Sequence, residues 1–136
     1  MGDEVSDILL DTHVLIWMAE KNRRLGRKAT ALIVDRESAL WLSSVSVWEI
    51  ANKARRGNLR LSAPAVQWLP RRMRENDISP LVMTHEHALA AAELPRYHED
   101  PFDRMLIAQA QVEDLRIVTA DAQFERYDVR LIDATL

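Results

Sequence analysis

Short apolar runs alternate with amphipathic stretches along this chain, and no other feature constrains its fold as much. Five runs favour β-strands, over residues 5–10, 39–42, 81–83, 116–119 and 130–132. Helical spacing of apolar residues predicts helices over 13–19, 26–37, 47–56, 64–74, 84–94 and 100–112, with a short one from 121. Strands separated by helices pair in parallel, so we expect an α/β sandwich.

Capping signals predict where several of these helices begin. Ser46, followed by Glu49 three residues later, matches a capping box. Thr84 is a suitable N-cap for the alanine-rich helix after it. Asp100 before Pro101 matches an N-cap and a first helical residue.

The length and the cysteine count limit the class of protein. A chain of 136 residues fits one domain, which we expect to span 1–136. The sequence has no cysteine, which excludes disulfides and thiolate catalysis and agrees with a reducing cytoplasm. No apolar run approaches the roughly 20 residues that span a membrane. The acidic start at Asp3 and Glu4 is unlike a secretory signal, so we expect a cytoplasmic protein.

The chain has a net charge of −3, so it cannot bind nucleic acid through an overall positive charge. Basic residues nevertheless form local clusters. They are Arg23, Arg24, Arg27 and Lys28; Lys53, Arg55, Arg56 and Arg60; and Arg71, Arg72 and Arg74. Each cluster alone is typical of a solvated helix face. Together they are compatible with a surface that follows a phosphate backbone.

Four acidic residues are expected at one edge of the sheet. Asp11 ends the first strand, Glu49 lies on the helix after the second, Asp103 opens the helix before the fourth, and Asp121 follows the fourth. Ligands of open α/β sheets bind beyond the carboxyl ends of the strands, so the four side chains are predicted to share a site.

Clustered carboxylates repel one another and favour a bound cation. Oxygen ligands without cysteine favour Mg²⁺ or Mn²⁺, which would activate water for phosphodiester hydrolysis. Each acid also has a structural alternative. Asp11 and Asp121 are possible helix caps, Glu49 a partner of Lys53 or Ser46, and Asp103 a charge at a helix N-terminus.

Several segments in order resemble the PIN-domain family, and within it the VapC-type toxins of type II toxin–antitoxin pairs. They are LLDTHVLIW at 9–17, SSVSVWEI at 43–50, HEDPFDRMLIAQA at 98–110 and VTAD at 118–121, with Lys53, Gly57 and Leu59 between them. Together they cover the chain nearly end to end. The resemblance implies a three-layer α/β/α sandwich around a five-stranded parallel sheet.

The resemblance also implies roles for particular residues. Asp11 and Asp103 match metal ligands, and Glu49 and Asp121 match acids that complete a catalytic pocket. Thr12 and Thr119 match hydroxyls that orient water at the metal. Arg104 is interpreted as a residue that orients carboxylates. His13 stands where many relatives have Asn or Ser, and its role is left open.

The implied function is a metal-dependent ribonuclease with protein partners. Members of the toxin group are commonly homodimers that cleave structured RNA, often tRNA or ribosomal RNA. A cognate antitoxin inhibits them by filling an apolar groove with its tail and directing a basic side chain into the acidic pocket. Of the tryptophans, we expect Trp17, Trp41 and Trp48 in the core and Trp68 exposed.

Other functions stay open or are disfavoured. A binding module without activity and a housekeeping RNA-processing enzyme would share this sequence pattern. A phosphoacceptor receiver domain would need a second acid beside Asp11, and Thr12 stands there. A nucleotide-binding enzyme would need a glycine-rich loop, and the chain has three glycines, all isolated. A zinc site at His85, His87 and His98 is disfavoured, and His98 is expected to fix its loop.

Overall fold

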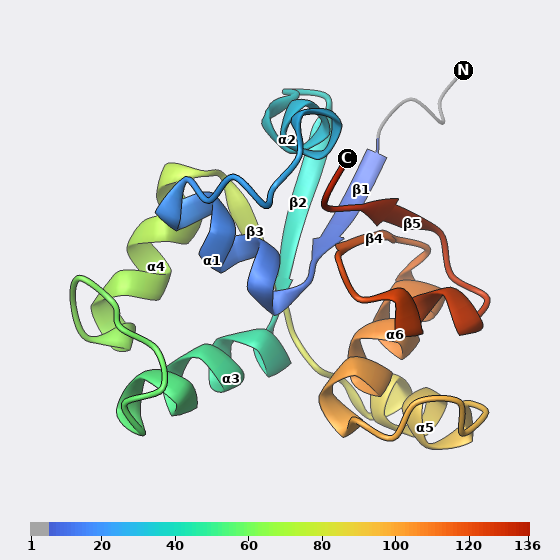
Figure 1. Cartoon of the computed structure of the whole chain (residues 1–136). Coiled ribbons are helices and arrows are strands. Elements are labelled where there is room, and N and C mark those ends of the chain that lie inside the picture. The colour runs from blue at the N-terminus through green and yellow to red at the C-terminus, as the bar shows by residue number, and fades with distance from the viewer. Residues whose placement is uncertain (1–5) are drawn as a thin grey trace.

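The computed structural model describes residues 6–136 and shows a sheet with helices on both sides (Figure 1). The strands are β1 (Ser6–Leu10), β2 (Ser38–Ser43), β3 (Ile78–Leu81), β4 (Arg116–Thr119) and β5 (Leu131–Asp133). The helices are α1 (Thr12–Glu20), α2 (Arg27–Val34), α3 (Ser44–Arg55), α4 (Ala65–Glu75), α5 (His85–Glu93) and α6 (Pro101–Glu113), followed by the 3-10 helix η2 (Ala122–Arg126). Asp3, Glu4 and Val5, on which sequence predictions rested, lie outside the described residues.

All four strand pairings in the sheet are parallel, and the strand order is β3-β2-β1-β4-β5. The chain extends the sheet from β1 through β2 to β3, then returns to the other side of β1 with β4. The order therefore reverses between β1 and β4, where open α/β sheets bind ligands beyond the carboxyl ends of their strands. The predicted five-stranded parallel α/β/α sandwich is confirmed.

Alternate side chains of β1 enter opposite halves of the core, because successive residues of a strand point to opposite faces. Ile8 and Leu10 belong to one hydrophobic cluster with side chains of α1, α2, α3 and α4. Leu9 belongs to the other, with side chains of α5, α6 and η2. All three β1 residues are fully buried, so β1 is the central strand of a three-layer structure.

The third strand lies three residues earlier than the predicted 81–83, and that prediction is corrected. β3 pairs with β2, with Leu40 opposite Ile78 and Leu42 opposite Pro80. Proline has no N–H to donate, and it is tolerated here because β3 is an edge strand. Val82, expected inside the strand, follows it and is 64% exposed.

Two predicted helix ends also need correction. The second helix ends at Val34 rather than at 37, because the Asp35 side chain accepts a 2.9 Å hydrogen bond from the Glu37 N–H. The third helix is capped by Ser43, whose Oγ accepts from the Val45 N–H at 3.0 Å. The predicted capping box at Ser46 is therefore wrong, since Ser46 lies inside α3.

Other predicted boundaries are confirmed. Thr84 caps α5 and Asp100 caps α6 with their side chains. Asp11 and Asp121 likewise cap α1 and η2. Among the helices of residues 6–136, none is long and apolar enough to span a membrane.

Candidate active site

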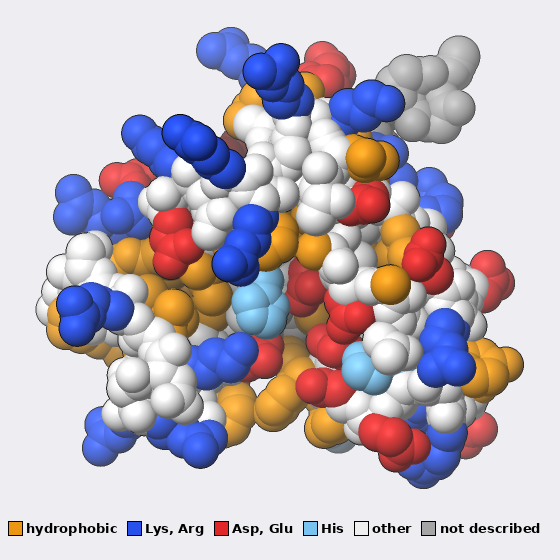
Figure 2. Space-filling view, viewed as in Figure 1, with side chains coloured by type: hydrophobic (Ala, Val, Ile, Leu, Met, Phe, Trp, Pro, Cys, Tyr) orange, Lys and Arg blue, Asp and Glu red, His pale blue; other side chains and the backbone are white. Residues whose placement is uncertain are grey.

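The four acidic residues predicted from the sequence line one cavity of about 470 Å³. Asp11 follows β1 and Asp121 follows β4, while Glu49 lies on α3 and Asp103 in the first turn of α6. Figure 2 shows acidic side chains gathered in a hollow at the middle of one face, with histidines beside them. The remaining lining residues are His13, Trp17, Lys53, His98, Asp100 and Ala120. The reversal of strand order between β1 and β4 thus brings these acids together.

Asp11 is held by one hydrogen bond on each carboxylate oxygen. Its Oδ1 accepts from the Thr12 N–H at 2.7 Å, and its Oδ2 accepts from the Thr119 hydroxyl at 2.7 Å. The side chain is buried, and burial raises the pKa of Asp11 above its usual range although both hydrogen bonds act to lower it. Asp11 is therefore a helix cap and also a desolvated acid facing the cavity.

The two predicted threonine hydroxyls are both bonded to protein groups. Besides donating to Asp11, the Thr119 hydroxyl accepts from the Asp121 N–H at 3.0 Å. The Thr12 hydroxyl donates to the Ser46 Oγ at 2.9 Å and so links α1 to α3. Thr119 thus positions Asp11 and the backbone of Asp121. A role of either hydroxyl in orienting water stays a prediction.

Asp103, in the first turn of α6, is a second acid of the cavity with a raised pKa. Burial raises its pKa from 3.8 to about 6, and the nearby charges of Asp100 and Asp11 act in the same direction. A 2.8 Å hydrogen bond between Asp103 Oδ2 and Nε2 of His98 opposes this rise. A carboxylate whose ionised form is disfavoured by burial is suited to a cationic partner.

Glu49 forms the ion pair with Lys53 that the sequence allowed, and it also lines the cavity. Its Oε2 lies 3.5 Å from Nζ of Lys53, one turn later on α3. Both residues line the cavity, so the ion pair lies inside the site and leaves Lys53 as a basic group beside the acids. The pairing with Lys53 does not remove Glu49 from the acidic group.

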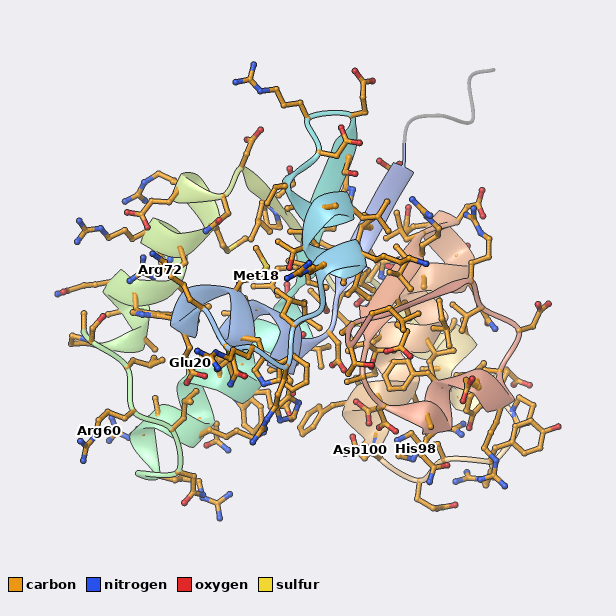
Figure 3. All side chains as sticks on the ribbon, turned by 45° about the horizontal axis from the view of Figure 1, so that its top comes forward. Met18, Glu20, Arg60, Arg72, His98 and Asp100 are labelled. Atoms are coloured by element: carbon orange, nitrogen blue, oxygen red, sulfur yellow. The ribbon has the colours of Figure 1, made fainter. Side chains whose placement is uncertain are left out.

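His98 belongs to the site, although sequence reasoning assigned it only to fixing its loop. Its Nε2 lies 2.8 Å from Asp103 Oδ2 and 3.8 Å from Asp121 Oδ2. Figure 3 shows His98 and Asp100 close together on the connection that leads into α6. The signal for this placement was the position of His98 just before Asp100, the cap of the helix that carries Asp103.

Arg104 does not orient carboxylates as predicted. Its guanidinium is buried and donates hydrogen bonds to backbone carbonyl oxygens at the end of α5 and in the loop after it. These are the carbonyls of Ala91, Leu94 and Pro95 at 2.9 Å and of His98 at 3.3 Å. The correct role is positional, because Arg104 fixes the loop that carries His98.

Two of the tryptophan predictions are wrong. Trp68 is 6% exposed and packs in the hydrophobic cluster that contains Ile8 and Leu10. The Arg72 guanidinium lies 5.6 Å from its ring centre. Trp48 is 54% exposed and lies against Phe102, with ring centres 5.4 Å apart. The apolar face of α4 points into the core, whereas Trp48 points away from it on α3.

The donor groups of the cavity fit a hard divalent cation. Ligand atoms of His98, Asp103 and Asp121 lie within 4.8 Å of one another, with Asp11 and Glu49 lining the same cavity. Carboxylate oxygens are the preferred ligands of Mg²⁺ and Mn²⁺. Burial raises the pKa of both Asp11 and Asp103, and a bound cation would favour their ionised forms.

Comparison with known proteins places this architecture in a family. The sequence matches the family model of the PIN domain over residues 8–130. It is 29% identical over 126 residues to Ribonuclease VapC22 of Mycobacterium tuberculosis, an alignment that covers 90% of this chain and 93% of the relative.

Solved structures show the same fold. VapBC2 from Rickettsia felis, bound to a DNA fragment from its promoter, superposes with a TM-score of 0.72 at 13% identity, covering 93% of this chain and 97% of that one. A toxin–antitoxin complex from Klebsiella pneumoniae superposes with a TM-score of 0.63 at 19% identity, with the same coverage. Because the family model matches all but the two ends of the sequence, the protein belongs to the PIN domain family, as its motifs predicted.

Proposed function

We propose that the protein is a metal-dependent endoribonuclease and the toxin of a toxin–antitoxin pair. The convergence of Asp11, Glu49, Asp103 and Asp121 on one cavity of a PIN domain carries this proposal. The relative that aligns along most of this chain is named a ribonuclease. We treat residues 1–136 as one such domain, acting on RNA in the cytoplasm.

Asp11 and Asp103 would hold a Mg²⁺ or Mn²⁺ ion, with Glu49 and Asp121 completing its surroundings. When bound, the ion supplies a Lewis acid that neutralises charge developing on the phosphodiester. Thr119 keeps the Asp11 carboxylate in place at the cavity through its 2.7 Å hydrogen bond. Hydrolysis at such a site needs no covalent intermediate with the protein.

Basic side chains near the cavity support RNA as the substrate. Lys53 lines the cavity itself, and Arg55 and Arg60 line a separate groove formed by α3 and the segment after it. Figure 2 shows further Lys and Arg side chains around the acidic hollow. Contacts from these groups to phosphates would hold the backbone while the acids act on one phosphodiester. The proposed substrate is a structured RNA such as tRNA or ribosomal RNA.

A groove between α3 and α4 supports an antitoxin as the protein partner. Its volume is about 850 Å³, larger than that of the acidic cavity. The lining is mostly apolar, with Ala51, Ala54, Leu59, Leu61, Ala63 and Val66 beside Arg55 and Arg60. We propose that the apolar tail of a cognate antitoxin lies here and directs a basic side chain into the acidic cavity. A homodimer is the proposed state of the toxin.

The nuclease is tested by incubating the purified chain with total RNA in Mg²⁺, Mn²⁺ or EDTA. Discrete fragments that require metal are expected. Asp11→Asn and Asp103→Asn should abolish them, whereas Asp128→Asn, an exposed aspartate outside the cavity, should not. Cleavage by a folded Asp11→Asn variant would contradict the site. No cleavage by folded, partner-free wild type would favour a binding module.

The toxin assignment is tested separately with a candidate antitoxin, sought as a small protein encoded beside the gene of this chain. Equimolar partner should suppress cleavage. Val66→Asp, at an 82% exposed position in the groove, should weaken that complex without affecting cleavage by the free chain. Val34→Asp, exposed on α2 outside the groove, is the matched control. Full activity within a confirmed complex would favour a housekeeping RNA-processing enzyme.

A further inference from the structure

We propose that Nε2 of His98 joins the carboxylates of the site as a direct ligand of the divalent ion, beside Asp103 and Asp121, and that this nitrogen makes the site favour Mn²⁺ over Mg²⁺. The inference deepens the proposed function and rests on it for the presence of an ion. It departs from the all-carboxylate site that the sequence predicts.

The spacing of the three donor atoms carries the proposal. Nε2 of His98 lies 2.8 Å from Asp103 Oδ2 and 3.8 Å from Asp121 Oδ2, and the three ligand atoms lie within 4.8 Å of one another. Two ligands at right angles around an ion with bonds of about 2.1 Å are roughly 3 Å apart, and opposite ligands roughly 4 Å. The His98–Asp103 distance therefore matches neighbouring ligands, the His98–Asp121 distance lies between the two values, and a shift of less than about 1 Å would bring all three donors around one ion.

The backbone that carries the imidazole is fixed from both sides of its loop. The backbone N–H of His98 donates to the Tyr127 hydroxyl at 2.8 Å, and that hydroxyl donates to the carbonyl of Pro95 at 2.8 Å. Arg104 donates to the carbonyls of His98 and Pro95 from α6. A buried arginine and a buried tyrosine thus fix the loop backbone from which the His98 ring reaches Asp103 and Asp121.

A purely structural role for His98 would not require this position. A histidine that only fixed its loop would direct its ring nitrogen at loop atoms. The ring nitrogen of His98 instead faces two acids carried by different elements, Asp103 on α6 and Asp121 after β4. The hydrogen bond between His98 and Asp103 joins two of the atoms that would share the cation.

The nitrogen donor has a consequence for metal choice. Mg²⁺ strongly prefers oxygen ligands and an octahedral shell rich in water. Imidazole is a common ligand of the first-row transition ions, to which Mn²⁺ belongs. A site with one imidazole among carboxylates should therefore bind Mn²⁺ more tightly than Mg²⁺, and should lose much of this preference when the imidazole is removed.

The test measures metal binding by the full-length chain without RNA. Mn²⁺ alone is titrated and its free concentration followed by electron paramagnetic resonance, with Mg²⁺ as competitor. Spin-echo modulation of the bound Mn²⁺ then reports a directly coordinated ¹⁴N nucleus. The variants are His98→Gln and, as the matched control, His13→Gln, because His13 is the other histidine that lines the cavity. Circular dichroism checks that each variant folds.

We expect ¹⁴N modulation in wild type and His13→Gln and its loss in His98→Gln. Mn²⁺ binding should weaken about tenfold or more in His98→Gln, and Mg²⁺ binding by less than about threefold. Bound Mn²⁺ without ¹⁴N modulation would overturn the proposal, as would modulation that depends on His13, or equal losses for the two ions. Such a result leaves the ribonuclease proposal standing if RNA is still cleaved, so the two failures are distinguishable.

Discussion

The hydroxyl of Thr119 donates a 2.7 Å hydrogen bond to Oδ2 of Asp11 and so ties the end of β4 to the carboxylate at the end of β1. The two strands are neighbours in the sheet, and the bond crosses the point where the strand order reverses. The same hydroxyl accepts from the Asp121 N–H. One side chain therefore sets the relative positions of two acids of the site.

Replacing Thr119 with valine keeps its shape and removes this hydroxyl. We expect Thr119→Val to raise the metal concentration needed for half-maximal RNA cleavage by about 10- to 100-fold, because outer partners orient metal ligands. Thr119→Ser keeps the hydroxyl and should stay within a few-fold of wild type. The measurement is the Mn²⁺ activation curve of each variant. Identical curves for the valine and serine variants would contradict this role of the hydroxyl.

The raised pKa of Asp103 predicts how the metal-free protein responds to pH. With a folded-state pKa of about 6 against an ordinary 3.8, the folded protein binds this proton more tightly than the unfolded chain. The contribution of Asp103 therefore favours folding below pH 4 and is lost as the pH rises through about 6.

Urea unfolding in EDTA at several values between pH 4 and 7 measures this effect. The free energy of unfolding of Asp103→Asn relative to wild type should increase with pH, because the variant never carries the buried charge. Adding Mn²⁺ at pH 7 should then stabilise wild type and not Asp103→Asn. A difference between the two proteins that is constant with pH would contradict the raised pKa.

Arg104→Lys is expected to destabilise the protein by about 3 kcal/mol. The buried guanidinium donates to several backbone carbonyls at once, and one ammonium group cannot reach them all. Arg130→Lys is the control, since Arg130 is exposed and its pair with exposed Asp114 contributes little. Urea unfolding of both variants checks the prediction. Equal stabilities would show that the loop does not depend on Arg104.

Substitution by alanine should affect protein stability very differently at Trp68 and at Trp48. Trp68→Ala removes a side chain buried in the core and should cost about 3–5 kcal/mol. Trp48→Ala removes a side chain that is more than half exposed and should cost about 1 kcal/mol or less. Thermal unfolding of the two variants compares them directly. A larger loss at Trp48 would place it in an interface rather than on a free surface.

The fold class and the four acids were accessible from the sequence because their signals are local. Strand and helix periods alternate along the chain, and parallel pairing follows from that alternation. Asp11 and Asp121 each follow a strand directly, so the sheet alone directs both to the same edge. Asp11 and Asp121 could therefore be placed from the sequence, because the position of each depends on the end of a single strand.

The tertiary structure decided everything that depends on partners distant in the sequence. Helical spacing marks an apolar face but not what covers it, so Trp48 and Trp68 were assigned in reverse. The guanidinium of Arg104 on α6 reaches backbone carbonyls of α5 and of the loop after it only because α5 packs against α6. His98 likewise joins the acids because that packing places its loop beside Asp121, which follows β4. Local sequence determines the elements, whereas long-range packing determines which side chains meet.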